Sequence, residues 1–421
     1  MHALLHPVGS HGDVHPLVAI GRGLVARGHR VTLVTAAPFR GVAAACGFAF
    51  ATVGTDADYE AVVHNPDLWH PRRGLRTIFA PESFARHLRE SYRHLAERYV
   101  PGETVCVAGD LGFPAARLAQ ETLGLPVVSS HIAPVAFQSV ADPPTVAFGR
   151  PPDWLPRWAC RWAYRLGGKY AIDPAFRPAV NGFRRELGLP PLARLWGTWN
   201  DSPQRVLGLF PEWFAHAPDW PAHLRQAGFP VYDGGGELPP AVEQFLSDGP
   251  PPVVISFGTA MRTGRAHFAA AVETVRQVGR RGLVLAKSGE QVPPLPPGFL
   301  HAEYAPFGRV FPRCAAVIHH GGIGTTAQGL AAGVPQLVMP LAFDQHDNAA
   351  RLERLGVART VSATRFTSTH AVTNLLLLLG DPGVPAACAA AKARMAEGDA
   401  VAEACRWVEE LQGTDRPGGW R

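Results

Sequence analysis

Short apolar runs alternate along this chain with stretches in which apolar residues recur at helical spacing. The run from Ala3 to Leu5 ends in a proline and glycine turn, and Leu17, Ile20 and Leu24 then follow at helical spacing up to Gly28. A β-branched run at 31–35 comes next. This order predicts a strand, a helix and a second strand of one parallel sheet.

The same alternation continues through the rest of the chain. Further strands are expected at 48–53, 104–108 and 127–129, then from 253, and at 283–286, 315–319 and 336–339, with a long helix at 81–99. Two α/β halves of similar plan therefore follow one another. We expect an N-terminal Rossmann-like domain at 1–232, a linker at 233–251, a C-terminal Rossmann-like domain at 252–399, and an amphipathic helix at 400–421 that packs back on the first domain.

Composition narrows the class of protein. Of the 421 residues, 47% are hydrophobic and 18% are charged, which is typical of globular domains. The net charge is +5 and the basic residues are dispersed, so no nucleic-acid partner is expected. The six cysteines lie far apart and contain no CxxC, which favours reduced thiols, and the N-terminus lacks the features of a signal peptide. We expect the protein in the cytoplasm, either free or in contact with a membrane.

A glycine-rich segment of the second half carries the most specific chemistry. His320 is followed by Gly322 and Gly324, which come between a predicted strand and a predicted helix. Backbone N–H groups and the positive end of a helix dipole meet at such a point, which suits a diphosphate. The pair Asp344 and Gln345 ends the next strand and offers an acceptor and an amide for sugar hydroxyls.

A second group of polar residues lies in the first glycine turn of the chain. Transfer of a group to an alcohol requires removal of the acceptor proton, and His11 is a candidate base for that step. Asp110 ends another predicted strand and is a candidate to orient the His11 ring. Asp13 is an alternative base, although a helix cap is the ordinary role of an aspartate there. We favour His11, because an ordinary carboxylate is a weak base at neutral pH.

The segment 304–348 resembles the donor-binding signature of the family 1 glycosyltransferases, the UDP-glycosyltransferase-like enzymes of the GT-B fold. The resemblance implies two Rossmann-like domains that face each other across a cleft, with the acceptor bound by the first and a nucleotide sugar by the second. It assigns the pyrophosphate to His320, Gly322, Gly324 and Thr325, the ribose to Gln328, the base to Tyr304, and a further phosphate contact to the turn at Ser256, Gly258 and Thr259. Plant members have an acidic residue where this chain has Gln328 and a tryptophan where it has Tyr304, so the nucleobase stays open between UDP- and dTDP-linked donors.

The same resemblance informs the choice between the two candidates for the general base. A His–Asp pair acts in plant and macrolide enzymes at positions matching His11 and Asp110, whereas glycopeptide enzymes use an aspartate matching Asp13. Segments at 65–71, 201–204 and 209–234 look most like the rhamnosyltransferases of rhamnolipid biosynthesis, which lack counterparts of His11 and Asp110. The resemblance implies inverting transfer of a sugar to a hydroxyl of an apolar small-molecule or lipid acceptor, without a metal or other cofactor. The alternatives are a catalytically silent sugar-nucleotide-binding partner protein and a sugar-nucleotide epimerase of the same fold.

One aromatic segment stands outside this scheme. Trp154, Trp158 and Trp162 recur every four residues, and arginines at 157, 161 and 165 follow the same rhythm. On a helix this spacing places an aromatic stripe beside a basic one. We favour a helix that packs its tryptophans into the core, and the alternatives are the wall of an acceptor pocket and a face that rests on an anionic membrane surface.

Overall fold

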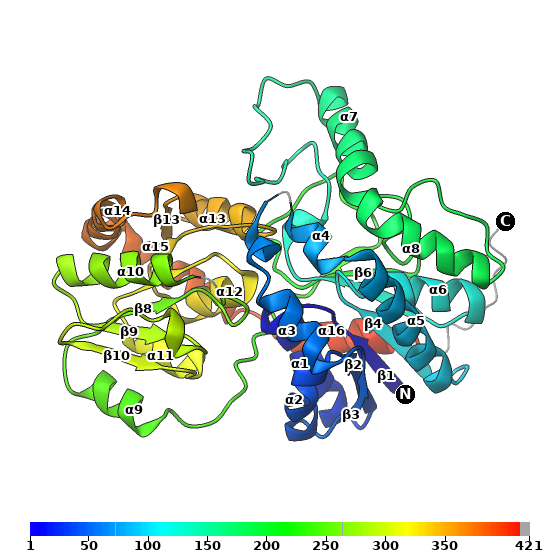
Figure 1. Ribbon diagram of the computed structural model, residues 1–421, viewed down its shortest axis with the longest axis horizontal. Helices are drawn as coiled ribbons and strands as arrows, with labels where there is room; N and C mark the ends of the chain where they lie inside the picture. The colour runs from blue at the N-terminus through cyan, green and yellow to red at the C-terminus, as the bar shows by residue number, and fades with distance from the viewer. Residues whose placement is uncertain (72, 263, 413–421) are drawn as a thin grey trace.

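Two parallel β-sheets, one in each half of the chain, organise the protein (Figure 1). The structure is a computed structural model that describes residues 1–71, 73–262 and 264–412. The α/β class, the GT-B arrangement of two Rossmann-like sheets and the alternation expected from the sequence are confirmed.

The N-terminal sheet has seven strands in the order β3-β2-β1-β4-β5-β6-β7. The strands are β1 (His2–His6), β2 (Arg30–Thr35), β3 (Ala49–Thr52), β4 (Thr104–Ala108), β5 (Val127–His131), β6 (Arg205–Gly208) and β7 (Leu224–Gln226). The helices of this half are α1 (His11–Ala26), α2 (Arg40–Ala45), α3 (Asp56–Val63), α4 (Gly74–Ile78), α5 (Pro81–Arg98), α6 (Phe113–Leu123), α7 (Arg157–Gly167) and α8 (Asp173–Glu186). Short turns of helix are η1 (Ala37–Phe39), η2 (Pro66–Trp69), η3 (Pro134–Ala136) and η4 (Gly168–Ile172).

The C-terminal sheet has six strands in the order β10-β9-β8-β11-β12-β13. The strands are β8 (Val253–Ser256), β9 (Gly282–Leu285), β10 (Phe299–Ala302), β11 (Ala316–His319), β12 (Gln336–Val338) and β13 (Ala358–Thr360). The helices are α9 (Pro240–Ser247), α10 (Arg265–Gln277), α11 (Phe307–Val310), α12 (Ile323–Ala332), α13 (Gln345–Arg354), α14 (Ser368–Gly380), α15 (Gly383–Met395) and α16 (Ala400–Glu409), with short turns η5 (Gly289–Gln291), η6 (Phe311–Arg313) and η7 (Ala363–Arg365).

Each sheet contains a point at which the strand order reverses. In the first sheet β1 lies between β2 and β4, and in the second β8 lies between β9 and β11. The chain leaves these neighbouring strands in opposite directions, which opens a crevice beyond their carboxyl ends, where ligands bind in open α/β sheets. The two crevices are formed by the turns after β1 and β4 and by those after β8 and β11.

The segment predicted as a linker contains α9. Residues between β7 and α9 form neither helix nor strand, as the loss of periodicity indicates, but Val242 and Leu246 of α9 pack against Val254 and Leu283 of the C-terminal sheet. The chain therefore crosses between domains before α9, at about the segment 227–239.

The last helix returns to the first domain, as expected. In Figure 1, α16 lies beside α1, among the elements of the N-terminal half. Gly23 of α1 makes this approach close: a Cβ there would lie 2.5 Å from Val401 Cγ1. Arg27 and His29 both contact the Glu409 carboxylate at 2.8 Å. Residues 413–421 of the predicted terminal segment lie outside the described residues.

The aromatic stripe is not in the core, contrary to the interpretation favoured from the sequence. Trp154, Trp158 and Trp162 are 79%, 67% and 56% exposed. Helix α7 instead buries its opposite face, through Cys160 and through Tyr164, whose hydroxyl donates to the Ser139 carbonyl at 2.8 Å. The helix is amphipathic with its aromatic side outward.

Membrane-spanning segments were searched for over the described residues. No single helix there is both long and apolar enough to cross a bilayer, and one pair, 368–380 with 383–409, satisfies the criteria together but is bent by 75°.

Candidate functional site

A cavity of about 1030 Å³ lies between the two domains. Its walls come from the turns after β1, β4, β8 and β11, so both crevices open into one space. On the N-terminal side it continues into an apolar region lined by Leu75, Phe79, Phe84, Ile132 and Phe176. A polar end and an apolar end therefore share one cavity, as in sites for amphipathic small molecules.

The turn after β1 ends at the N-terminus of α1 in a capping box. Ser10 Oγ accepts from the Gly12 amide at 3.2 Å, and Asp13 Oδ2 accepts from the Ser10 amide at 2.7 Å and from the Ser10 hydroxyl at 3.0 Å. Asp13 thus has the helix-capping role and also lines the cavity. Burial, with a smaller contribution from Asp110, raises the pKa of Asp13 to about 6, so this carboxyl is a stronger base than an ordinary aspartate.

His11, at the first position of α1, reaches across the domain boundary. Its Nδ1 lies 3.2 Å from Thr259 Oγ1, in the turn after β8. Burial, aided by the positive charges of His15, Lys287 and Arg262, lowers the pKa of His11 to about 4. The ring is therefore neutral at pH 7, and without a ligand it is a weaker base than Asp13, the reverse of the order of basicity expected from the sequence.

The expected hydrogen bond between His11 and Asp110 is not formed among the described residues. The Asp110 carboxylate instead bonds His131 Nδ1 and accepts from the Ile132 amide at 3.2 Å. The reason is topological, because β5, which ends at His131, is the other neighbour of β4 and directs this side chain at Asp110. Asp110 does line the cavity with His11.

His131 is held between two carboxylates. Its Nε2 lies 2.8 Å from Asp201 Oδ1, opposite the bond to Asp110. Burial favours the neutral ring, but Asp110 and Asp201 outweigh it and raise the pKa of His131 to about 10. His131 is therefore an imidazolium at neutral pH that fixes Asp110 in the cavity wall. Sequence analysis missed His131, although its place at the end of the strand beside Asp110 was a usable signal.

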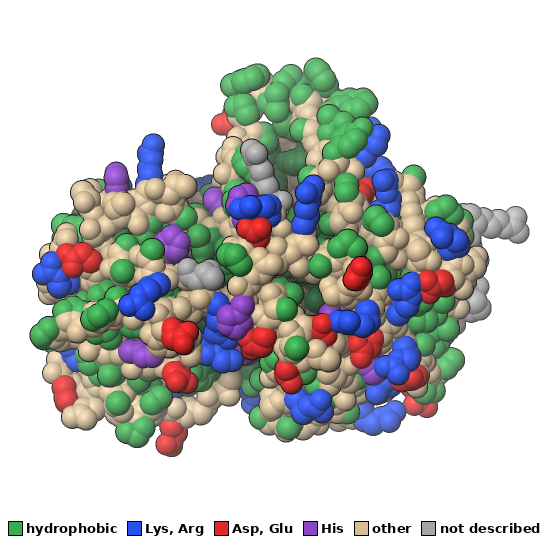
Figure 2. All heavy atoms as spheres, viewed as in Figure 1, with side chains coloured by type: hydrophobic (Ala, Val, Ile, Leu, Met, Phe, Trp, Pro, Cys, Tyr) green, Lys and Arg blue, Asp and Glu red, His purple; other side chains and the backbone are tan. Residues whose placement is uncertain are grey.

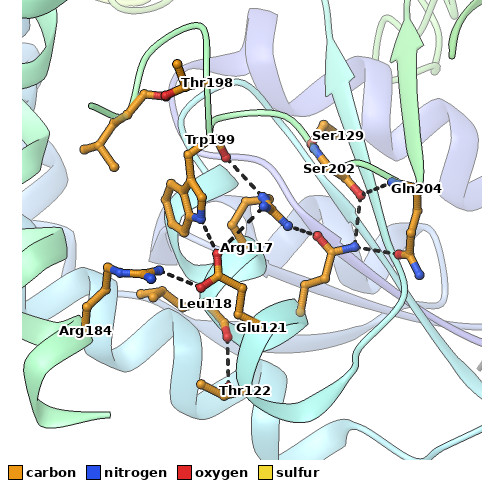
Figure 3. A network of polar contacts seen from close by, with 12 residues as sticks. Arg117, Leu118, Glu121, Thr122, Ser129, Arg184, Thr198, Trp199, Ser202 and Gln204 are labelled. Atoms are coloured by element: carbon orange, nitrogen blue, oxygen red, sulfur yellow. Dashed lines mark hydrogen bonds and ion pairs between the residues drawn. The ribbon is translucent and has the colours of Figure 1, made fainter. Parts of the chain in front are cut away.

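A network of polar contacts holds the loop that carries Asp201 (Figure 3). Arg117 Nε donates to the Trp199 carbonyl at 3.0 Å, and Gln120 Nε2 donates to Ser202 Oγ at 3.0 Å. The Ser202 amide in turn donates to Ser129 Oγ at 2.8 Å. Helix α6 and β5 thus fix the loop from both sides, which keeps Asp201 at His131.

On the C-terminal side, His320 lies between two glycines. It follows β11, and the parallel register that pairs His319 with Ser256 brings it beside the turn after β8. A Cβ at Gly258 would lie 2.8 Å from His320 Cε1, and one at Gly322 would lie 2.6 Å from His320 Nε2. Only glycine leaves room for the ring at both places. His320 Nδ1 is buried and has no hydrogen-bond partner in the described structure.

The residues predicted to hold the diphosphate, here called the cradle, lie at the N-terminus of α12. Gly322 caps this helix without a side-chain bond, and Gly324 and Thr325 in its first turn line the cavity. A Cβ at Gly324 would lie 3.7 Å from Gly12 Cα, so the N-termini of α1 and α12 approach each other across the cavity. Two helix dipoles therefore point their positive ends into the same space. Ser256 lies at the end of β8 and also lines it.

Asp344 and Gln345 lie beside this cradle and differ in their hydrogen-bond partners. Asp344 Oδ2 accepts from the Ile323 amide at 3.2 Å and from Asn348 Nδ2 at 2.7 Å. Burial, and then the charge of Asp13, raise the pKa of Asp344 to about 7. Gln345 is buried, and its Oε1 accepts from the amides of Leu341 and Ala342 at 2.8 and 3.1 Å. That oxygen is committed to the loop, so Asp344 is the freer of the two groups for a ligand.

Tyr304 and Gln328 lie at the far wall of the cradle, where the interdomain segment crosses it. The Tyr304 hydroxyl donates to the Asp233 carbonyl, and the Asp233 Oδ2 accepts from the Gly308 amide at 3.1 Å. Gln328 is buried, and its Oε1 lies 3.9 Å from a Cβ placed at Gly308, with Asp233 Oδ2 2.8 Å from the same point. The linker therefore supplies a carboxylate beside the position expected to hold a ribose.

Two further cavity residues were missed from the sequence. Trp69, from η2 of the first domain, stands edge-on to His320 with ring centroids 6.0 Å apart, and its buried indole N–H has no partner in the described structure. Lys287 follows β9 and lines the cavity near His11. An isolated tryptophan or lysine carries no motif, so only the fold brings these donors to the cradle. Among the described residues, no group of three or more His, Cys, Asp or Glu side chains has the arrangement of a metal site.

Comparison with known families finds a match in each half of the chain. Residues 4–141 match the glycosyltransferase family 28 N-terminal domain, and residues 274–411 match the C-terminal domain of erythromycin biosynthesis protein CIII-like proteins. The two matched segments contain the turns after β1 and β11 that face each other across the cavity.

Individual proteins resemble the chain over most of its length. O-mycaminosyltylonolide 6-deoxyallosyltransferase of Streptomyces fradiae is 29% identical, with 97% of both chains covered. Sterol 3-beta-glucosyltransferase UGT80B1 of Arabidopsis thaliana is 28% identical over 80% of this chain and 56% of its own. The solved structure of the glycosyltransferase VinC in complex with dTDP superposes with a TM-score of 0.70 at 19% identity, covering 98% of this chain and all of that one.

Proposed function

Since this chain is a glycosyltransferase of the GT-B fold, we propose that it transfers a sugar from a nucleoside diphosphate sugar to a hydroxyl of an apolar acceptor bound in the interdomain cavity. The observation that carries the proposal is the facing pair of helix N-termini, α1 and α12, beside a buried histidine with an unpartnered nitrogen. The relatives act, by their names, on a macrolide and on sterols, which accords with the apolar end of the cavity.

The diphosphate of the donor would occupy the cradle. Gly324 and Thr325 in the first turn of α12, His320 and Lys287 all line the cavity. Together they would stabilise the negative charge that develops on the departing diphosphate. A dTDP-linked donor is favoured over a UDP-linked one, because VinC was solved with dTDP. Rhamnose is one candidate sugar, from the resemblance of 201–234 to rhamnosyltransferases.

His11 is proposed as the base, and Thr259 rather than Asp110 as its orienting partner. If Nδ1–H donates to Thr259 Oγ1, then Nε2 carries the lone pair that accepts the acceptor proton. The pKa of His11, which is low in the free enzyme, would rise when a diphosphate binds nearby, because the negative charge of the diphosphate stabilises the imidazolium. Attack from the face opposite the diphosphate would invert the anomeric centre.

The ribose would be held by Asp233 with Gln328. A carboxylate is the usual partner of a ribose diol. In this chain Asp233 of the linker would supply it, because Gln328 stands at the position that is acidic in plant members. The nucleoside would then contact the segment that joins the two domains, and donor binding would restrain their relative motion.

The experiment is a release assay with purified protein. UDP-glucose, dTDP-glucose and dTDP-rhamnose are each offered with a pool of macrolide aglycones and sterols, and nucleoside diphosphate and glycosylated product are followed by mass. We expect release that requires one donor and one acceptor together, and an inverted anomeric configuration of the product by NMR. Tight donor binding without release under any pairing would instead identify a silent nucleotide-sugar-binding protein.

Variants in the same assay separate the candidate bases. We expect His11→Ala to lower kcat by about 10²- to 10⁴-fold, the range for loss of a general base. Asp110→Asn should lower it less, since Asp110 is bonded to His131. Loss of activity in Asp13→Asn with full activity in His11→Ala would identify Asp13, and not His11, as the general base. Circular dichroism checks that each variant is folded.

A further inference from the structure

The exposed stripe begins at Trp154, just before α7, runs along that helix and ends beyond it in η4. After Trp154, Trp158 and Trp162, the row at intervals of four proceeds to Leu166 and Tyr170, which are 48% and 67% exposed. Large apolar side chains rarely gather on the free surface of a soluble domain unless something covers them. Figure 2 shows hydrophobic side chains gathered at the end of the molecule where α7 projects in Figure 1.

Basic side chains accompany the stripe. Arg157, Arg161, Arg165 and Lys169 are all exposed, and each stands one residue before one of the last four apolar members of the row. Among the described residues, none of the three arginines has an ion-pair partner. Asp153 is the one acidic residue between 151 and 172. The surface is therefore aromatic along one line and positive along the next, and its charge is not neutralised within the chain.

The stripe adjoins the apolar end of the cavity. The inner side of the same helix contributes Ala163 and Tyr164 to the cavity wall, and Gly167 and Gly168 continue that wall where α7 ends. Val146, on the loop before α7, lines the cavity too and is 40% exposed. One helix thus carries the candidate docking face on its outside and part of the acceptor compartment on its inside.

We propose that this face, made by Trp154, Trp158, Trp162, Leu166 and Tyr170 with the four basic residues, docks the enzyme on an anionic lipid bilayer. Tryptophan and tyrosine prefer the interfacial region, and arginine and lysine beside them pair with anionic headgroups. Charge complementarity selects a lipid surface over an apolar protein groove, which would leave four cations without partners. Docked in this way, α7 would separate the bilayer from the cavity wall at Tyr164, and an apolar acceptor would enter beside the helix, past the exposed Val146.

The test is flotation of the full-length protein with vesicles, without substrates, so that it is independent of the transferase proposal. We expect binding to phosphatidylcholine mixed with phosphatidylglycerol, weaker binding to phosphatidylcholine alone, and loss of binding at high salt. Trp158→Ala with Trp162→Ala should weaken partitioning by on the order of tenfold for each buried ring. Arg157→Gln, Arg161→Gln and Arg165→Gln together should weaken it by on the order of a hundredfold.

Two control variants remove exposed apolar or basic side chains from parts of the surface outside the stripe. Leu376→Ala with Leu377→Ala removes two exposed apolar side chains from α14, and Arg185→Gln, Arg280→Gln and Arg365→Gln remove three exposed cations. Both controls should bind vesicles as the parent does. Absence of vesicle binding, or equal binding by the tryptophan variant, overturns the proposal. A dimer seen by light scattering, abolished by the tryptophan variant and accompanied by no vesicle binding, also overturns it and assigns the stripe to an interface between copies.

Discussion

At the residue scale, the site contains two carboxyls that, once ionised, would repel the diphosphate of a bound donor. Asp13 and Asp344 face each other across the cradle, and burial raises their pKa values to about 6 and about 7. Above pH 7 both are ionised next to the expected diphosphate, and below pH 6 both are largely neutral. The charge of a nucleotide sugar stays constant over this range. We therefore expect donor affinity, measured by calorimetry, to fall by up to about tenfold for each carboxyl as pH rises through 6 and 7.

The variant Asp344→Asn tests how much the charge of Asp344 contributes to the pH dependence of donor affinity. It keeps a side-chain oxygen that can accept from the Ile323 amide but removes the charge, so the affinity should vary less above pH 6 and should exceed that of the parent at pH 8. The variant keeps His11 and His320 unchanged, so the difference between its pH profile and that of the parent reports Asp344. An unchanged pH profile in the variant would show that Asp344 does not oppose the diphosphate.

At the element scale, the contact of α1 with α16 depends on an absent side chain. Gly23 lies inside α1, where glycine has a low helix propensity. A Cβ at this position would lie 2.5 Å from Val401 Cγ1 and 2.8 Å from Cys405 Sγ, so only glycine allows α16 to pack this closely. Gly23→Ala should lower the free energy of unfolding by about 1 to 3 kcal/mol, as overpacking does. Urea denaturation followed by circular dichroism measures the change.

Gly182 provides the control for that substitution. It lies within α8, and a Cβ there would meet nothing within 4 Å. Gly182→Ala should therefore stabilise the protein by about 0.5 to 1 kcal/mol, which is the propensity gain alone. If both substitutions stabilise to the same extent, α16 does not pack against α1 as closely as described.

At the scale of the whole molecule, a polar contact joins the loop before α7 to the helix that begins at the donor cradle. Asp142 accepts from Arg351 at 2.9 Å and from Arg354 at 3.1 Å, and the Thr145 amide donates to Asp347 at 2.9 Å. Arg351 and Asp347 are 3% and 1% exposed, so this interdomain contact excludes water. It holds the loop at 142–145, on the N-terminal side of the cavity, against α13.

Asp142→Ala should loosen the two domains without unfolding either. Arg351 keeps its bond to Asp347 at 2.7 Å, which limits the penalty of a buried charge. We expect the KM for the donor to rise by about 5- to 150-fold with kcat little changed, and the radius of gyration from X-ray scattering to increase. Glu186→Ala removes a carboxylate from the Arg89 ion pair within the first domain and should change neither quantity.

Local patterns along the chain determined the elements and many residues of the candidate donor site. Glycine turns after buried strands predict phosphate-facing helix N-termini, since backbone geometry at such a turn depends on neighbours a few residues away. His320, Gly322, Gly324 and Thr325 were found in this way and lie together in the structure. The capping role of Asp13 was equally local.

Contacts between distant segments were decided only by the tertiary structure. Asp110 pairs with His131, not His11, because β4 has neighbours on both sides and the pattern of one strand does not say which neighbour's side chain will reach it. Asp233, Trp69 and Lys287 reach the cradle from three other segments, without a motif. The exposure of the α7 stripe was likewise undetermined, because helical spacing shows which residues share a face but not whether another element covers that face.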